Sequence, residues 1–207
     1  MIAIPAETPA ISDAMDLLSL PGGVVDGLVA IAQGSGVALG PARTATVIDS
    51  HDPNIPGLAE YLDGAQDGDM LVLGWEAAGP RSVWGGLAAT RTQASGCVGL
   101  VTQGWVRDLV EVRDTSLLVW ATGSTPRSGK GRLAVDRVGE PTMVGEILVR
   151  DRDLVVSDAT GVCVVPQEHQ RAVLDKAAEL QRRDDVFRQS LETGASFEVA
   201  RDQAGTM

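Results

Sequence analysis

Two short, almost continuously apolar runs constrain the fold more than any other feature of the sequence. They are "GDMLVLG" at 68–74 and "CVGLVTQG" at 97–104, and the segment between them, 84–95, has helical character after a glycine-rich entry. Runs of this length, bounded by glycine turns, are typical of buried strands. Buried strands that alternate with helices predict an α/β domain.

The other segments of the chain extend this pattern. Residue spacing predicts helices over 11–20, 57–65 and 167–193 and a strand over 39–48. It also predicts paired strands with glycine turns over 133–149 and a hairpin over 153–166 around an Asp-x-x-Gly turn. Either 109–112 or 117–121 supplies a further strand. Because no linker or repeat divides the chain, residues 1–207 are predicted to form one domain that ends in a helix.

Composition excludes several classes of function. The chain carries 28 acidic and 17 basic residues, a formal net charge of −11, so an anionic nucleic acid is a poor partner. No apolar run is long enough to cross a membrane, and the N-terminus lacks the pattern of a signal peptide. Cys97 and Cys163 lie in valine-rich runs and are predicted to be buried thiols. A cytoplasmic protein is expected.

Three common catalytic patterns are not supported. The glycine-rich stretch 123–132 lacks the spacing of a phosphate-binding loop, since Gly131 follows Lys130 where a Ser or Thr is needed. It is predicted to be a flexible basic loop, exposed or lying over an anionic ligand. Neither Lys130 nor Lys176 has the apolar surroundings of a Schiff-base lysine. His51 has polar neighbours and is predicted to lie in a solvated turn.

Arg107 and Asp108 are the strongest candidates for a site. They follow the buried run 97–104 after a predicted "GW" turn. An exposed ion pair at a strand end is one interpretation. The other is a binding site, because an arginine can clamp a carboxylate with two hydrogen bonds and a carboxylate can hold a divalent cation. Such a pair could hold a 2-oxo acid, with amides of the helix start "GGLAA", 85–89, completing an anion pocket.

The ordered motifs of the chain resemble a known family. The segments concerned are "ISDAMDLL", "GVALGPARTATV", "GDMLVLG", "WGGLAATRTQASGCVGLVTQGWVRD", "SGKGR", "VSDATGVCVVP" and "LETGASFEV". Together they resemble the family that contains regulator of ribonuclease activity A and the 4-hydroxy-4-methyl-2-oxoglutarate/4-carboxy-4-hydroxy-2-oxoadipate aldolases. The resemblance implies an α/β layered sandwich around a central mixed sheet, of the swivelling phosphohistidine-domain type. It also implies a homotrimer or homohexamer with pockets between subunits.

The resemblance further implies a mechanism and its residues. In the aldolase branch the arginine holds the pyruvoyl carboxylate and the aspartate helps to hold Mg²⁺ or Mn²⁺, roles that match Arg107 and Asp108. Amides at the helix start bind the pyruvate oxygens and match Gly86, Leu87 and Ala88. A glutamate of the neighbouring subunit supports the metal, and Glu198 is the nearest match. The implied activity is retro-aldol cleavage that releases pyruvate, with oxaloacetate decarboxylation as a side activity.

The sequence departs from the aldolase pattern at positions that bear on activity. Gly86 stands where the aldolases carry an aspartate 21 residues before the arginine, Gln103 replaces a common aspartate, and Trp75 and Glu76 are unusual. Glu76 could supply the missing acid. Three functions stay open: a metal-dependent 2-oxo-acid lyase, a different reaction in the same carboxylate pocket as part of specialised metabolism, and a non-catalytic protein-binding regulator of ribonuclease E type.

Overall fold

A central mixed β-sheet organises the protein. The computed structural model describes residues 6–21, 23–34 and 36–205. Nine strands form the main sheet, in the order β1-β6-β5-β3-β2-β10-β11 with β4 beside β5 and β7 beside β2, and β8 and β9 form a separate hairpin. The strands are β1 (Val29–Gln33), β2 (Ala38–Asp49), β3 (Met70–Trp75), β4 (Ser82–Trp84), β5 (Gly99–Val106), β6 (Leu118–Ser124), β7 (Leu133–Asp136), β8 (Thr142–Val144), β9 (Ile147–Val149), β10 (Leu154–Ser157) and β11 (Val162–Val165).

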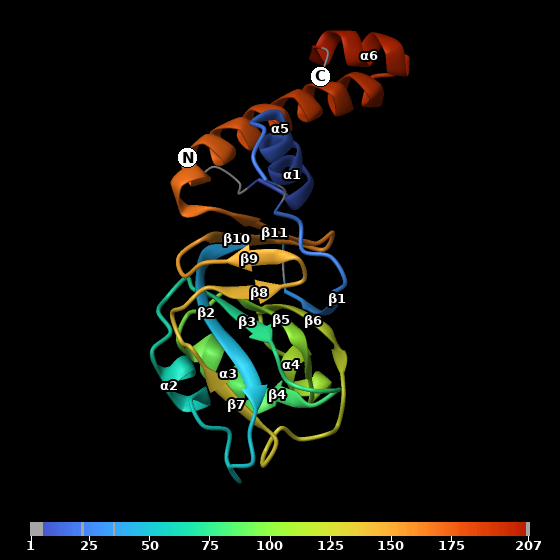
Figure 1. Ribbon diagram of the computed structural model, residues 1–207. Helices are drawn as coiled ribbons and strands as arrows, with labels where there is room; N and C mark the ends of the chain where they lie inside the picture. The colour runs from blue at the N-terminus through green and yellow to red at the C-terminus, as the bar shows by residue number, and fades with distance from the viewer. Residues whose placement is uncertain (1–5, 22, 35, 206–207) are drawn as a thin grey trace.

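The described residues include six α-helices. They are α1 (Thr8–Leu17), α2 (Leu58–Asp63), α3 (Gly86–Ala94), α4 (Leu109–Arg113), α5 (Gln170–Glu192) and α6 (Phe197–Ala204), with a 3₁₀ turn at Gln167–His169 before α5. Helices α2, α3 and α4 lie beside the sheet, while α1, α5 and α6 lie beyond β10 and β11 (Figure 1). The predicted mixed α/β architecture with a C-terminal helix is confirmed. The short strands β1 and β4 and the second C-terminal helix α6 were not predicted.

The central strands run parallel and end at one edge of the sheet. β2 pairs with β3, β3 with β5, and β5 with both β4 and β6, all in parallel, whereas β1, β7 and β10 join in antiparallel orientation. Open sheets bind ligands outside the carboxyl ends of their parallel strands. The segments that follow β4, β5 and β6 therefore meet where a site is expected.

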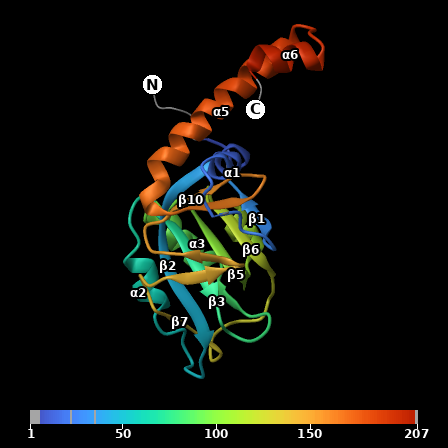
Figure 2. The ribbon, with the colours of Figure 1, turned by 45° about the horizontal axis from the view of Figure 1, so that its top comes forward.

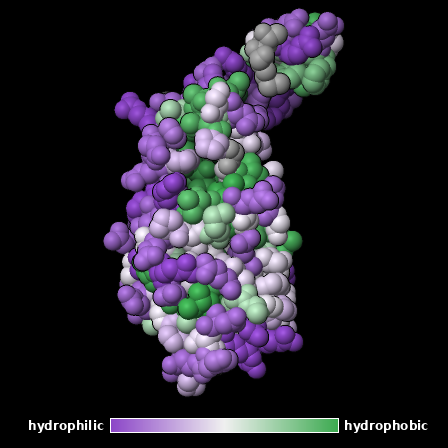
Figure 3. Space-filling view, in the orientation of Figure 1, coloured by the Kyte–Doolittle hydropathy of each residue, from purple (hydrophilic) through white to green (hydrophobic). Residues whose placement is uncertain are grey.

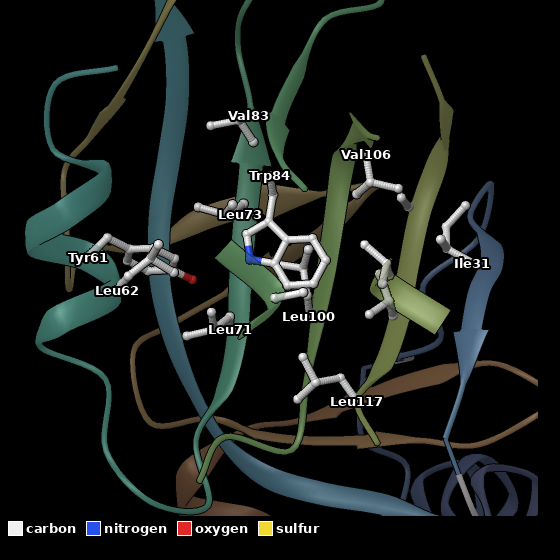
Figure 4. Close-up of a cluster of buried hydrophobic side chains, with 14 of the residues drawn as sticks. Ile31, Tyr61, Leu62, Leu71, Leu73, Val83, Trp84, Leu100, Val106 and Leu117 are labelled. Carbon is white, nitrogen blue, oxygen red and sulfur yellow. The ribbon is translucent and has the colours of Figure 1, made fainter. Parts of the chain in front are cut away.

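Successive side chains of the central strands bury opposite faces of the sheet, as the period of two requires. Leu71 and Leu73 of β3 pack in the core beneath α2, α3 and α4, together with Trp84 (Figure 4). Met70 and Val72 face the other way and pack in the core beneath the β8–β9 hairpin. Both faces of β3 are thus buried, which explains its continuous apolar sequence.

The C-terminal helices form an arm that leaves the body of the protein. α1 packs against α5 above β10 and β11, and their apolar side chains form a third core. Beyond this contact α5 continues away from the sheet, and α6 folds back onto it (Figures 1 and 2). Ser196 is the N-cap of α6, because its Oγ accepts a hydrogen bond from the N–H of Val199 at 3.3 Å. Hydrophilic side chains cover much of the face shown in Figure 3, with separate apolar patches between them.

The structure corrects one local prediction, at the end of β5, and decides between two alternatives for the next strand. The expected turn at Gly104–Trp105 is wrong, because β5 continues to Val106. A Cβ atom at Gly104 would lie 2.3 Å from the Trp75 ring, so this glycine makes room for an aromatic side chain within a strand. Of the two alternatives for the next strand, 117–121 is correct, and 109–112 is instead in α4.

The two cysteines are buried, as predicted. Cys97 and Cys163 are both buried free thiols. Burial raises the pKa of Cys97 to about 11 and that of Cys163 to about 12, so neither is a reactive thiolate at neutral pH. Among the helices within residues 6–21, 23–34 and 36–205, none is long and apolar enough to cross a bilayer.

Asp158 joins the 153–166 hairpin to α1. Its carboxylate accepts hydrogen bonds from the N–H and Oγ1 of Thr8, at 2.7 and 2.8 Å, and from the N–H groups of Thr160 and Gly161, at 2.7 and 3.3 Å. Burial raises the pKa of Asp158, but these hydrogen bonds outweigh burial and leave the pKa below its ordinary value. The charged carboxylate therefore stabilises the folded protein.

We expect Asp158→Asn to lower the free energy of unfolding by about 1–3 kcal/mol at pH 7, because hydrogen bonds to a charged acceptor are lost. Urea unfolding measures this difference. The pKa of Asp158 is lower in the folded protein than in the unfolded chain, where it is near 3.9. The stability that this difference gives is present above the unfolded-state pKa and is lost as the pH falls through the folded-state pKa. The difference in the free energy of unfolding between the wild type and Asp158→Asn should therefore decrease as the pH falls into the acid range. Asp175→Asn, at an exposed position on α5, should have almost no effect.

Candidate functional site

Three segments meet beyond the carboxyl ends of the parallel strands. Arg107 and Asp108 follow β5 directly, Gly85 links β4 to α3, and the loop after β6 approaches from the other side. The N–H of Arg107 donates to the carbonyl of Trp84 at 3.2 Å, which joins the ends of β4 and β5. The sheet thus places the predicted arginine–aspartate pair beside the predicted helix start.

Asp108 has a left-handed backbone, with φ 55° and ψ 46°. For a residue other than glycine this conformation costs roughly 1–2 kcal/mol, and aspartate tolerates it better than most. The turn directs the carboxylate away from its own helix: Oδ2 accepts from the N–H of Gly86 at 3.2 Å and lies 3.3 Å from Nε of Arg107. A strained residue at a strand end is a frequent feature of functional sites.

The glycines before α3 allow close approach to these side chains. A Cβ atom at Gly85 would lie 2.6 Å from Oδ2 of Asp108 and 2.8 Å from Cγ of Arg107. A Cβ atom at Gly86 would lie only 1.8 Å from Oε2 of Glu111. The carboxylate of Glu111 therefore occupies the space that a side chain at position 86 would fill.

Glu111 is a site residue that sequence reasoning missed. It lies in α4, three residues after Asp108, and both acids line the same cavity. This spacing was a usable signal, but it depended on recognising 109–113 as helix rather than strand. Glu76, the residue considered as a replacement acid, instead forms an ion pair with Arg137 and is not among the residues that line the cavity.

A cavity of about 460 Å³ lies over these groups. Its ionic lining residues are Arg107, Asp108, Glu111 and Lys130, and the remaining lining residues are Ile55, Leu58, Ser82, Val83, Trp84, Gly85, Leu87, Ala88 and Ser128. The amides of Leu87 and Ala88 belong to the first turn of α3, whose N–H groups lack intrahelical acceptors and can bind an anion. A second hollow of about 300 Å³ is lined by Arg107, Asp108 and residues 109 and 124–126.

Glu198 is not brought to this cavity within one chain. It belongs to α6 at the end of the C-terminal arm, whereas α3 and α4 lie at the opposite end of the molecule (Figure 1). The structure therefore places five of the predicted residues together, namely Arg107, Asp108, Gly86, Leu87 and Ala88, and Glu198 apart from them.

The other candidates also have defined positions. His51 is exposed in the loop after β2, as predicted. Lys176 lies on α5 and forms an ion pair with Glu179 at 3.0 Å. Part of the glycine-rich stretch, Gly123 and Ser124, belongs to β6, and the segment that follows lines the cavity through Ser128 and Lys130.

The donor set fits a hydrated divalent cation. Among the described residues there is no group of three or more His, Cys, Asp or Glu side chains that could hold a metal ion. Asp108 and Glu111 line one cavity as a pair. Mg²⁺ is often held by one or two carboxylates, with water and substrate oxygens completing its shell. Two acids beside an open cavity match that pattern, whereas a closed structural site would need four ligands.

Comparison with known proteins places this fold and site in context. The RraA-like family (Aldolase/RraA) matches residues 8–164. A Halalkalibacterium halodurans protein named "Putative 4-hydroxy-4-methyl-2-oxoglutarate aldolase" is 28% identical over 86% of this chain and 81% of its own length. Protein DlpA of Legionella pneumophila is 25% identical over 93% of this chain, which spans only 31% of that protein.

Solved structures agree with the sequence comparison. An uncharacterized protein from Pseudomonas syringae pv. tomato superposes with a TM-score of 0.84 at 26% identity, covering 95% of this chain and 92% of the other. Streptomyces coelicolor RraAS2, described as an unusual member of the RNase ES inhibitor RraA protein family, gives a TM-score of 0.78 at 25% identity, covering 88% and 91%. On the family match over most of the chain, this protein belongs to the RraA-like family.

Proposed function

We propose that this protein is a divalent-metal-dependent lyase that acts on a 2-oxo acid and releases pyruvate. The observation that carries the proposal is the convergence of Arg107, Asp108 and Glu111 on one cavity at the start of α3. An arginine, two acids and free helix amides are what a 2-oxo acid and a hydrated cation need. Similarity to proteins named as aldolases supports the same class.

The residues divide the work as follows. The guanidinium of Arg107 binds the C1 carboxylate through two hydrogen bonds, and the N–H groups of Leu87 and Ala88 orient the pyruvoyl oxygens. Asp108 and Glu111 would hold Mg²⁺ or Mn²⁺, with Gly86 leaving room for Glu111. When bound, the cation stabilises the negative charge that develops as the substrate becomes pyruvate enolate.

Oxaloacetate decarboxylation needs fewer catalytic groups from this site than retro-aldol cleavage does. Loss of CO₂ leaves the enolate directly, whereas retro-aldol cleavage also needs a base to take the proton of the C4 hydroxyl. Gly86 has no side chain to supply that base, Glu76 is paired with Arg137, and Glu111 is assigned to the metal in this proposal. We therefore expect decarboxylation to be the faster reaction and aldol cleavage the slower one.

The proposal also includes the oligomeric state and the cellular compartment. We propose one domain over residues 1–207 in a homotrimer or homohexamer, in which the C-terminal arm of a neighbouring subunit brings Glu198 to the metal. Buried free thiols at Cys97 and Cys163 support a reducing compartment such as the cytoplasm. The same pocket could serve another carboxylate substrate in specialised metabolism.

A non-catalytic, protein-binding role is the second candidate. Its support is the similarity to a Streptomyces protein of the RNase ES inhibitor family and the net charge of −11. Binding of a ribonuclease E-type enzyme by the purified protein, with no metal-dependent turnover, would favour this role over the lyase.

Pyruvate release from oxaloacetate and from 4-hydroxy-4-methyl-2-oxoglutarate tests the lyase proposal. With Mg²⁺ or Mn²⁺ the protein should accelerate oxaloacetate decarboxylation above the rate of the free ion, and excess EDTA should abolish the difference. Lactate dehydrogenase coupling reports the pyruvate formed. If neither substrate turns over with either metal at any protein concentration tested, the lyase proposal is wrong.

A further inference from the structure

One oxygen atom of Asp108 lies between two groups that can bind a ligand anion. Its Oδ2 accepts a hydrogen bond from the N–H of Gly86 at 3.2 Å and lies 3.3 Å from Nε of Arg107. The N–H of Gly86 belongs to the first turn of α3, where amides lack intrahelical acceptors and attract anions. The guanidinium of Arg107 attracts carboxylates through its charge and its paired donors. The chain therefore places a carboxylate of its own where a ligand carboxylate would bind.

The local backbone supports this position of the carboxylate. Asp108 has φ 55° and ψ 46° and is the N-cap of α4, a left-handed conformation that few residues other than glycine adopt. Gly85 provides the space, because a Cβ atom there would lie 2.6 Å from Oδ2 of Asp108. The turn between β5 and α4 and the glycine before α3 together allow the carboxylate to approach the helix start.

Glu111 offers a comparison within the same cavity. It also lines the cavity, and its carboxylate lies close to Gly86, where an added Cβ atom would be 1.8 Å from Oε2. Within the described part of the chain, no hydrogen bond or ion pair joins Glu111 to Arg107 or to the N–H of Gly86. Both acids are therefore near the helix start, but of the two it is Asp108 that contacts the anion-binding groups.

We propose that Asp108 competes with the ligand carboxylate for Arg107 and for the start of α3. This inference rests on the proposed function, since it concerns how the metal and the substrate regulate each other's binding at that site. A ligand carboxylate that uses Nε of Arg107 and the N–H of Gly86 must displace Oδ2 of Asp108. A divalent cation would attract the same carboxylate and so weaken its hold on Arg107. Metal and ligand carboxylate therefore increase each other's affinity, as linkage requires.

Binding of pyruvate in excess EDTA tests this competition in the absence of any metal. Pyruvate has a single carboxylate and is not cleaved, so a ligand-observed NMR titration measures its affinity directly. Asp108→Asn should bind pyruvate about five- to tenfold more tightly than the wild type, the range expected when a partly exposed charged contact no longer competes. Asparagine tolerates the left-handed backbone as aspartate does, and circular dichroism checks that the variant is folded.

Glu111→Gln is the matched control, because it removes a carboxylate from the same cavity but not from Arg107 or Gly86. It should give a smaller gain in EDTA, of about twofold, through the solvent-screened change in charge. Equal gains in the two variants would mean that Asp108 acts through its charge alone, and that result would overturn the inference. An affinity of Asp108→Asn no higher than that of the wild type would also overturn it.

These results are separate from the test of the proposed function. Metal-dependent pyruvate release by the wild type decides whether the protein is a lyase, whereas the titrations in EDTA involve neither metal nor turnover. A lyase whose Asp108→Asn variant shows no gain in EDTA would leave the proposed function in place and overturn this inference alone. A wild type without turnover would overturn the proposed function, and a gain confined to Asp108→Asn would still support the competition at Arg107.

Discussion

Replacing Arg107 with alanine should lower kcat/KM for oxaloacetate by about 10²–10³-fold, because the carboxylate of the substrate loses its two charge-assisted hydrogen bonds. Arg107→Lys should recover only part of this loss, since an ammonium group keeps the charge but not the planar pair of donors. Steady-state kinetics with Mg²⁺ gives both values. Most of the effect should appear in KM if Arg107 binds the ground state and the transition state equally.

The same variants decide between a binding residue and an exposed ion pair. The Arg107 and Asp108 side chains are 37% and 40% exposed, so their contact contributes less than about 1 kcal/mol to folding. Urea unfolding of Arg107→Ala should therefore match the wild type within that margin. Arg91→Ala removes an arginine that pairs with Asp63 at 2.9 Å, and kcat/KM should not change. Normal oxaloacetate turnover by Arg107→Ala would show that Arg107 forms only a surface ion pair and does not bind the substrate.

The sheet was predictable because its strands are buried on both faces. The runs that contain β3 and β5 are therefore mostly apolar, so each stands out in the sequence without reference to its neighbours. β4 has only three residues and could not be recognised in this way. Its place is determined by parallel pairing with β5 and by hydrogen bonds of Ser82 to a distant segment. These are tertiary contacts that local patterns do not report.

Some residues of the site were predictable from local sequence patterns and others were not. Arg107 and Asp108 could be found because they follow a recognisable strand, and Gly86 because a helix start was expected there. Glu111 could not be assigned while 109–112 was open to both strand and helix, since a strand would point it and Asp108 to opposite faces. The left-handed backbone of Asp108 turns the chain into α4 and so brings the two acids to one cavity. Lys130 reaches the same cavity only through the anchoring of its segment to β4.

The relation between Gly86 and Glu111 leads to a second large effect. Glu111→Ala should weaken Mn²⁺ binding by about 10–100-fold, the usual loss when a group that supports a bound metal is removed. Gly86→Asp alone should also weaken binding, because its Cβ would lie 1.8 Å from Oε2 of Glu111 and displace that carboxylate. Calorimetric titration of Mn²⁺ measures both losses without relying on turnover.

Combining the two substitutions should reverse the loss. In the double variant Gly86→Asp/Glu111→Ala, the space beside α3 is open and a carboxylate reaches it from position 86 instead of 111. Mn²⁺ affinity should then exceed that of either single variant, which is strong coupling of the kind expected for residues in direct contact. Gly86→Ala/Glu111→Ala is the control, since it fills position 86 without an acid and should remain as weak as Glu111→Ala. If the losses of the two single variants simply add in the double variant, the carboxylate of Glu111 does not serve in place of the acid that the aldolases carry at position 86.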